Sequence, residues 1–456
     1  MRRQILVVLA AAFLVVAGVP AAGTPSEPAA VRLPAVDAGE ITTSYDDLVQ
    51  HFYKRLPPQT IVDGARDGLL RALARAGIRD AHLPPLRAGE TDQQTAAVLE
   101  AAVRDALVQA HGRLSPRSLS YAAIGGMMAS ARDRWTVFLT PKEYAALNKG
   151  LDGGHFGGIG VVIQIDDATK YIAISNVIPN GPADKAGLQQ NDLITAIDGV
   201  STRGMSLPQA SAKLRGKAGT VVRLTIERDG RLLASPVLIV RAEIPELSVF
   251  EKMLPGDIGY VEITVFGRDT GDELRTDLQR LRRDGMKALV LDLRDNGGGY
   301  LQAAISVCSA FIAEGPIVSV LSRGSNLTTI EADDTAFPPV PLVVLVDKNT
   351  ASASEITTGA LQDDGVATVI GTRTFGKGVV QTIYQLPDGA AVKITTARYY
   401  TPLNHDIDHL GIQPDIVVPE NAHPRYGDLA HDAQLRRAVQ FLQDRLAHAN
   451  PTDYGV

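Results

Sequence analysis

The spacing of apolar residues between Ser44 and Asn148 predicts helices. Apolar positions recur there every three or four residues, as on the buried face of an amphipathic helix. Thr140, Pro141 and Glu143 form a further helix start, because threonine can cap the first turn and proline fits within it. We therefore expect a helical N-terminal region over residues 41–150, with helices at 46–54, 61–76, 91–111 and 116–132.

Residues 153–241 carry shorter apolar runs that are separated by glycine and Asp-Gly turns. A glycine turn leads into an expected strand at 157–165, and β-branched residues dominate a second one at 220–228. Strands are also expected at 171–177 and 192–199, and a helix at 207–215. This segment is predicted to be a β-rich domain.

Residues 245–420 alternate between buried strands and helices. Apolar runs predict strands at 258–265, 288–293, 341–346 and 366–370, with helices at 272–283, 301–312 and 355–362 between them. Such alternation favours an α/β core with parallel strand pairs. The chain is thus predicted to be a multidomain α/β (α+β) protein that ends in a helical segment over 421–456.

Composition narrows the class of protein. The chain has 456 residues, 45% of them hydrophobic, so it can build about three domains with proper cores. Its net charge is −6 and no basic patch dominates, which argues against nucleic acid as a partner. The single cysteine, Cys308, cannot form an internal disulfide and is expected to be a buried apolar residue.

The N-terminus has the pattern of an export signal. Arg2 and Arg3 precede an apolar run at 5–16, and small residues follow up to Ala22, where we expect cleavage. Retention of the segment as a membrane anchor is the alternative. We expect a signal peptide at 1–22, a linker at 23–40, and a periplasmic, cell-envelope or secreted location.

Two segments carry the candidate chemistry. Asn349-Thr-Ala-Ser-Ala-Ser-Glu355 breaks the buried strand at 341–346 and precedes a helix, so a hydroxyl can be exposed at the turn. Lys377 stands between two glycines, where a tight turn can hold its amine still. A serine nucleophile with a lysine base is an alternative to the Ser-His-Asp triad. Spacing alone leaves Thr350, Ser352 and Ser354 as candidate nucleophiles.

A lysine base must be neutral, so the Lys377 pKa has to fall by ~2–3 units through burial. Its neighbour Gln381 lies four positions further on in a strand-like run, and positions four apart share one face of a strand. A neutral amide suits this place, because a carboxylate would keep the lysine protonated.

Several motifs in one order resemble the C-terminal processing peptidases, also called tail-specific proteases. They are "LVLDLRDNGGGYLQAAI", "NTASASEI", "GALQDDG", "GTRTFGKGVVQ" and "LGIQPDIVV". "DRWTVFLTPKEY" (Asp133–Tyr144) fits the segment that precedes the PDZ domain of this family, and "GPADKAGLQQNDLITAIDG" resembles a bacterial PDZ domain. The resemblance covers residues 118–420.

The resemblance implies a role for each site residue. The family's nucleophile lies 25 positions before the lysine, which selects Ser352 as nucleophile and leaves Ser354 as the helix cap. Gln381 is implied to orient Lys377, and Gly297 to donate an N–H to the oxyanion. The backbone N–H of Ala353, just after the nucleophile, is the other expected donor. Asp363 is interpreted as a structural hydrogen-bonding residue.

The PDZ resemblance implies a site for a peptide tail. Gly158, Ile159 and Gly160 are the candidate residues for binding its carboxylate, with the peptide added as a strand beside 159–163. The alternative is that these glycines only permit a tight turn. Expected partners are proteins or peptides with free C-termini, a second copy of the chain bound through the helical region, and a regulatory adaptor.

We expect no cofactor and no metal. Gly297–Gly299 is not part of a phosphate-binding G-x-x-x-x-G-K-[ST] pattern, and the metal-like spacing of His405 and His409 is interpreted as a solvated loop. The predicted function is an exported serine endopeptidase that cleaves proteins near their C-termini, with a PDZ domain that binds tails and gates activity. The alternatives are a non-catalytic PDZ adaptor and a latent protease.

Overall fold

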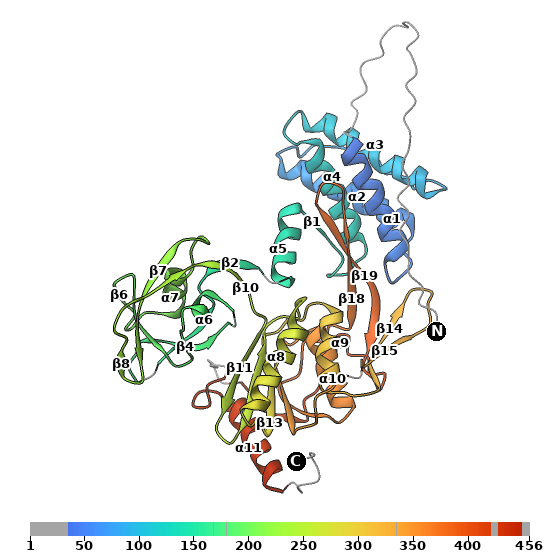
Figure 1. Cartoon of the computed structure of the whole chain (residues 1–456). Coiled ribbons are helices and arrows are strands. Elements are labelled where there is room, and N and C mark those ends of the chain that lie inside the picture. The colour runs from blue at the N-terminus through green and yellow to red at the C-terminus, as the bar shows by residue number, and fades with distance from the viewer. Residues whose placement is uncertain are drawn as a thin grey trace, which may run out of the picture.

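The structure is a computed structural model that describes residues 35–152, 154–166, 168–178, 180–333, 335–420 and 427–448. The predicted signal peptide at 1–22 lies outside the described residues, as does the linker up to residue 34. No helix in the described part of the chain is long and apolar enough to cross a membrane. Three bodies follow one another along the chain: a helical region, a β-rich domain and an α/β core (Figure 1).

The helical region packs around close contacts between glycines. A Cβ at Gly64 would lie 2.5 Å from the carbonyl oxygen of Gly126, so the helices that carry these glycines approach closely. Thr91 caps one helix, and Thr140 and Glu143 form a reciprocal capping box at the start of another, as expected for Thr140. The helices are α1 (Ala35–His51), α2 (Pro58–Arg75), α3 (Asp92–Ala110), α4 (Pro116–Ser130) and α5 (Pro141–Leu151).

The β-rich domain has a sheet with a free edge. Its strand order is β3-β4-β5-β7-β8, with β6 on β5 and β9 on β7, so β3 is an edge strand. A separate ribbon of β2 and β10 brings the two ends of the domain together. The elements are β2 (His155–Gly158), β3 (Val161–Ile165), β4 (Ile172–Val177), α6 (Pro182–Lys185), β5 (Leu193–Ile197), β6 (Val200–Ser201), α7 (Leu207–Leu214), β7 (Val221–Arg228), β8 (Arg231–Leu232), β9 (Val237–Val240) and β10 (Ala242–Pro245).

The core is built on a sheet of order β11-β12-β13-β16-β17-β20, parallel from β12 onward. Helices α8, α9 and α10 supply apolar residues to one face and α11 to the other. The predicted alternation of strands and helices is confirmed. The elements are β11 (Val249–Leu254), β12 (Ile258–Ile263), α8 (Thr270–Arg283), β13 (Ala288–Asp292), α9 (Leu301–Ser309), β16 (Leu342–Val346), α10 (Ala353–Asp363), β17 (Ala367–Gly371), β20 (Ile416–Val417) and α11 (Ala433–His448).

A second sheet joins the core to the helical region. Its order is β1-β19-β14-β15, with β18 also paired to β19. The far end of the β18–β19 hairpin, at Leu386, Val392 and Ile394, belongs to the same apolar cluster as the N-terminal helices (Figure 1). The segment before β1 therefore lies beside strands that follow Lys377 in sequence. The strands are β1 (Val137–Leu139), β14 (Pro316–Ser322), β15 (Thr328–Glu331), β18 (Val379–Gln385) and β19 (Ala391–Tyr400).

Candidate active site

Ser352 occupies the turn between the buried strand β16 and helix α10. Its backbone has φ 58° and ψ −116°, a strained conformation for a residue with a side chain. The other two candidate hydroxyls are buried and engaged, since Thr350 donates to the carbonyl oxygen of Leu293 (2.8 Å) and Ser354 to that of Asn296 (3.0 Å). Only Ser352 among the three lines the cavity described below.

The expected cap of α10 was wrong. Ser354 lies within the first turn, and the residue at the cap position is Ser352 itself. The Ser352 N–H donates to the carboxylate of Glu355 (2.9 Å), and Glu355 is three positions further along the helix. The strand-to-turn junction therefore starts the helix one residue after Ser352 and directs its first N–H groups outward.

The glycine loop after β13 approaches Ser352 closely. Gly298 has φ +95°, and a Cβ there would lie 2.8 Å from the Ser352 Cβ and 2.7 Å from the carbonyl oxygen of Ala351. The buried Asn296 holds the loop, because its side chain accepts from the Gly298 N–H (2.8 Å) and its carbonyl accepts from the Ala351 N–H (3.0 Å). Gly297 is exposed beside this contact, and apart from its chain neighbours a Cβ there would meet no atom of the described residues within 4 Å.

The fully buried carboxylate of Glu355 ties the serine turn to the lysine turn. One oxygen accepts from the backbone N–H groups of Ser352 and Lys377, both at 2.9 Å. The other accepts from the Gly376 N–H (2.7 Å) and the Thr374 hydroxyl (2.6 Å). Burial raises the pKa of Glu355, while these donors act to lower it. One side chain thus fixes the relative position of two segments that lie more than twenty residues apart.

Tyr399 makes a second connection between the same two turns. Its ring is buried, and its hydroxyl lies against the carbonyl oxygens of both Ser352 and Lys377. Because Glu355 binds the N–H groups of these residues and Tyr399 contacts their carbonyl groups, both backbones are held from two sides.

The glycines beside Lys377 are required by packing. Gly376 has φ +84°, and a Cβ there would lie 2.8 Å from the Gly411 nitrogen. A Cβ at Gly378 would lie 2.7 Å from Asp408, whose carboxylate accepts from the Gly378 N–H (3.2 Å). The loop before Gly411 therefore presses against the lysine turn.

That loop contains the two histidines with metal-like spacing. The side chains of His405 and His409 are 64% and 77% exposed. Among the described residues, no group of three His, Cys, Asp or Glu side chains could hold a metal ion. Asp363 accepts from the Leu403 N–H (2.9 Å) and so connects the end of α10 to the same loop.

A cavity of about 440 Å³ collects the predicted active-site residues. Ser352, Lys377, Gln381, Gly297 and Ala353 all line it. Apolar side chains complete the wall, namely Leu147, Leu151, Leu301, Ile356, Val379, Val380 and Ile383.

Gln381 lines the cavity with Lys377, but the two residues do not share one face of a strand as their spacing suggested. Lys377 precedes β18, and a bulge interrupts the strand between Val380 and Gln381, so the two-residue period does not run between them. The Gln381 amide donates to the carbonyl oxygen of Val379 (3.2 Å). Lys377 and Gln381 share the cavity wall because the chain turns, not because they lie on one face of a strand.

The cavity disfavours a charged lysine. Burial and the nearby ammonium of Lys393 together lower the pKa of Lys377 to about 8, while the carboxylates of Glu355 and Asp133 act to raise it. Lys393, on β19, lines the same cavity, and burial also lowers its own pKa. Among the described residues, no hydrogen bond joins the Lys377 amine to the Ser352 hydroxyl, and the amine lies 4.4 Å from the ring centre of Trp135.

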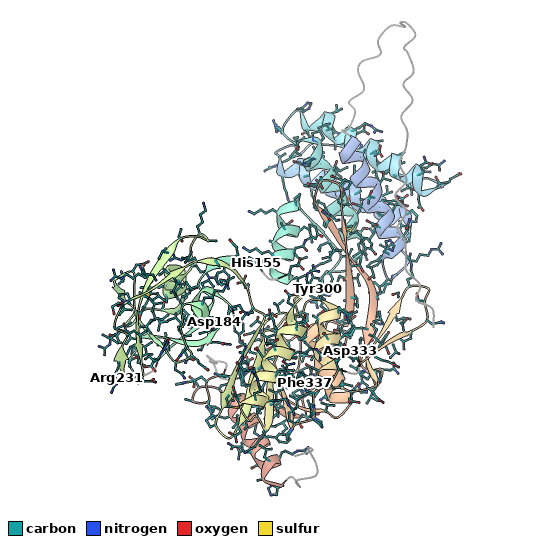
Figure 2. All side chains as sticks on the ribbon, viewed as in Figure 1. His155, Asp184, Arg231, Tyr300, Asp333 and Phe337 are labelled. Atoms are coloured by element: carbon teal, nitrogen blue, oxygen red, sulfur yellow. The ribbon has the colours of Figure 1, made fainter. Side chains whose placement is uncertain are left out.

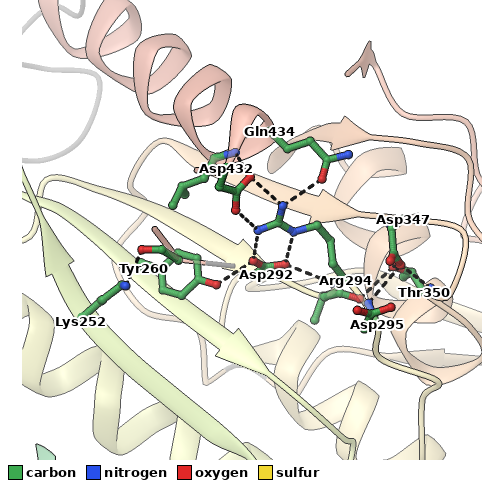
Figure 3. A network of polar contacts seen from close by, with 12 residues as sticks. Lys252, Tyr260, Asp292, Arg294, Asp295, Asp347, Thr350, Asp432 and Gln434 are labelled. Carbon is green, nitrogen blue, oxygen red and sulfur yellow. Dashed lines mark hydrogen bonds and ion pairs between the residues drawn. The ribbon is translucent and has the colours of Figure 1, made fainter. Parts of the chain in front are cut away.

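Buried ion pairs hold the segment that leads from β13 into the glycine loop (Figure 3). The Arg294 guanidinium binds Asp292 at 2.8 and 2.5 Å, and it binds Asp432, just before α11, at 3.0 and 2.7 Å. Gln434 of α11 accepts from the same guanidinium (2.9 Å). The C-terminal helix is thereby fastened to the strand that leads into the glycine loop.

Helix α5 connects the cavity to the start of the β-rich domain. Tyr300 (Figure 2), beside the glycine loop, donates its hydroxyl to Asp152 (2.9 Å), the residue directly after α5. His155, the first residue of β2, lies where the chain leaves α5 for the β-rich domain (Figure 2). Leu147 and Leu151 of α5 both line the cavity.

The predicted tail site lies at the end of β2. Gly160 has φ +77°, and Ile159 is buried. The carbonyl oxygens of Ile159 and Gly160 accept from the N–H groups of Ala183 (2.8 Å) and Ile178 (3.0 Å), which fixes the turn. The free edge of β3 faces a groove of about 830 Å³ between this domain and the core.

Comparison with known proteins gives the family. Residues 257–418 match peptidase family S41, and residues 174–228 match the PDZ domain. A carboxyl-terminal-processing protease of Picosynechococcus sp. is 38% identical over 310 residues, which cover 67% of this chain and 75% of the relative. One from Synechocystis sp. is 38% identical over 343 residues, which cover 74% and 80%. The chain belongs to the carboxyl-terminal-processing proteases.

This protease family is the one that the sequence motifs resemble, so the predicted family, the α/β fold class and the serine-type peptidase class are confirmed. A solved photosystem II D1 C-terminal processing protease is 28% identical with a TM-score of 0.45, and the match covers 85% of this chain and 94% of that one. As a protease of this family, the chain acts on protein substrates.

Sequence reasoning missed four residues of the candidate active site. Glu355 stood inside a motif but received no role, although a glutamate three positions after a candidate cap is a known capping signal. Tyr399 and Lys393 have no local signal at all, and Trp135 stood inside the motif at 133–144 but received no role. They reach the site from β19 and from the segment before β1, whose pairing no local pattern predicts.

Proposed function

We propose that this protein is an exported serine endopeptidase that cleaves protein substrates near their C-termini with a Ser352–Lys377 dyad. One observation carries the proposal: both residues line one cavity, while Glu355 and Tyr399 tie their backbones together. Export rests on the signal-like pattern of residues 1–22, and the location would be the periplasm, the cell envelope or the medium.

The reaction begins when the neutral Lys377 amine accepts the Ser352 proton as the serine oxygen attacks the scissile carbonyl. Negative charge then develops on the carbonyl oxygen, and the N–H groups of Gly297 and Ala353 stabilise it. The Lys377 ammonium returns the proton to the leaving amine. Water attacks the acyl-enzyme in the second half, with Lys377 again as base and Gln381 orienting the amine.

The pH dependence follows from the base. Since burial lowers the pKa of Lys377 to about 8, the neutral form is the minor one below that pH. Activity is therefore expected to rise with pH through about 8. By lowering the pKa of Lys377, the apolar cavity increases the fraction of neutral amine that can act as the base.

The PDZ domain is proposed to hold the substrate tail. The tail carboxylate would bind at Gly158, Ile159 and Gly160, and the preceding residues would extend the sheet along the free edge of β3. The contact of Tyr300 with Asp152 offers a route by which this domain gates the cavity.

Cleavage of a test substrate with varied C-terminal tails, followed by mass spectrometry of the products, tests both the proposed dyad and the proposed tail binding. S352A and K377A are expected to abolish cleavage, while S354A, which changes a buried hydroxyl outside the cavity, keeps it. A substrate whose tail ends in an amide instead of a carboxylate should be cut more slowly. Parental cleavage by S352A would reject the dyad and leave the PDZ adaptor as the better interpretation.

One observation favours a latent resting state. The Lys377 amine makes no hydrogen bond to Ser352 and lies on the Trp135 ring instead. If latency holds, a free tail peptide added in trans raises the cleavage rate of a tailless peptide substrate, and an amidated tail peptide does not.

A further inference from the structure

Trp135 is the single tryptophan of the chain, and the proposed chemistry gives it no role. It lies in the short turn between α4 and β1, inside the motif that precedes the PDZ domain. Its backbone N–H donates to the carboxylate of Asp133 (3.2 Å), which also accepts from the hydroxyls of Thr136 (2.7 Å) and Thr395 of β19. These contacts fasten the turn, and so the indole, to the sheet beside Lys377.

The indole face is the binding partner of the Lys377 amine. The amine nitrogen lies 4.4 Å from the ring centre, within the range of a cation–π contact. Among the described residues, this amine has neither a hydrogen bond nor an ion pair. The ring of Phe375 packs edge-on against the indole, with the two ring centres 6.1 Å apart, and the Arg134 guanidinium lies 4.5 Å from the indole ring centre.

Among the described residues, no other charged group forms an ion pair with the Lys377 ammonium, although the carboxylates of Glu355 and Asp133 attract it through space. Glu355 of α10 has both oxygens occupied by four donors, and Asp133 is engaged by Trp135, Thr136 and Thr395. Arg134 and Lys393 carry the same sign as Lys377 and repel it. A protonated Lys377 is therefore attracted to the electron-rich indole face, whereas a neutral amine gains little there.

We propose that Trp135 is a positioning residue that binds the ammonium form of Lys377 on its indole face, away from Ser352. The proposal rests on the proposed function, in which Lys377 is the base. The protease rests with its lysine protonated and disengaged. Deprotonation releases the amine from the ring and lets it turn to the Ser352 hydroxyl. Trp135 thus raises the pH at which the dyad becomes competent.

Tryptophan emission tests the contact without using catalysis. Because the chain has one indole, emission excited at tryptophan reports on that site alone. Between about pH 6 and about pH 10 we expect the parental protein to show a step with a midpoint near the Lys377 pKa of about 8. K377M should lack the step. K393M should show the step with a midpoint at higher pH, because the Lys393 charge that repels the Lys377 ammonium has been removed.

The pH profile of kcat/KM tests the consequence. Removing the indole removes stabilisation of the ammonium, so W135L is expected to move the acid limb down by about half to one pH unit. W135F, which keeps an aromatic face, should lie between W135L and the parental enzyme. A purely structural role for Trp135 would change kcat without moving the limb.

The outcomes separate the two proposals. Identical emission titrations for the parental protein and K377M would overturn the indole contact even if W135L fails to fold. An unmoved acid limb in folded W135L, with K377M inactive, overturns the inference and leaves the dyad standing. Parental peptidase activity in K377M rejects the dyad itself, whatever the emission shows.

Discussion

Replacing Glu355 by glutamine is the sharpest test of how the protease site is assembled. The carboxylate accepts four hydrogen bonds, two from the serine and lysine backbones and two from Gly376 and Thr374. A glutamine of the same shape keeps one oxygen and turns an NH₂ group toward the other pair of donors. Either orientation of the amide leaves two buried donors without an acceptor.

The expected loss of stability follows from those two unsatisfied donors. Each unsatisfied buried donor costs about 1–3 kcal/mol, so the gross loss is about 2–6 kcal/mol. Burial raises the pKa of Glu355, which means that the carboxylate is itself costly to bury, and its removal offsets part of the loss. We expect a net destabilisation of about 2–4 kcal/mol, and a loss of about 100-fold or more in kcat because a displacement of ~1 Å in a reacting group is enough for that.

The assay compares E355Q with E273Q by denaturant unfolding and by peptidase kinetics. Glu273, in the first turn of α8, also accepts backbone N–H groups, from Ser248 (2.8 Å) and Val249 (3.1 Å), but it does not line the active-site cavity. E355Q should lose both stability and kcat in the folded state. E273Q should lose little of either, because all of these donors bind one oxygen of Glu273, which a glutamine keeps. A kcat for E355Q within about twofold of the parental value would refute the argument that this carboxylate holds the dyad.

Three further predictions concern the glycine loop, the buried ion pair and the lysine. G298A should abolish activity because its Cβ would lie 2.8 Å from that of Ser352. G297A should retain activity, because its Cβ would meet no atom of the described residues within 4 Å apart from its chain neighbours. Equal activities of the two variants would contradict the packing argument. R294K should destabilise the core by about 3–5 kcal/mol, since a lysine cannot bind Asp292 and Asp432 in parallel. Helix α11 of this variant should then be cut in limited proteolysis. Unchanged resistance of α11 to proteolysis would contradict the proposed role of the Arg294 ion pairs. K377M should be more stable than the parental protein at pH 7, by about 3 kcal/mol at 1.36 kcal/mol per pH unit, because the folded-state pKa of about 8 lies below the ordinary 10.5. That advantage should vanish as the pH rises from about 8 to about 10.5, and a constant advantage across this range would show that the amine is not buried.

Local pattern was enough to predict most elements of the core. The buried strand at 342–346 and the helix after it are apolar runs bounded by turn residues, and the period of such runs follows from backbone geometry alone. The glycines beside Lys377 were also readable as a tight turn. Local pattern was not enough to choose the helix cap, because the cap depends on where the strand ends in space and on the partner that Ser354 finds in Asn296.

The sequence by itself determined the order of strands and helices, the two chemistry-bearing turns and their resemblance to a protease family, since all of these rest on residues close together in the chain. Only the tertiary structure decided that Glu355 and Tyr399 hold the two turns, that Lys393 shares the cavity, and that Trp135 faces the lysine amine. Those contacts join residues far apart in sequence, and they form because the β18–β19 hairpin packs into the helical region and pairs with β1. Burial and pKa depend on what surrounds a group in three dimensions, and no local pattern carries that information.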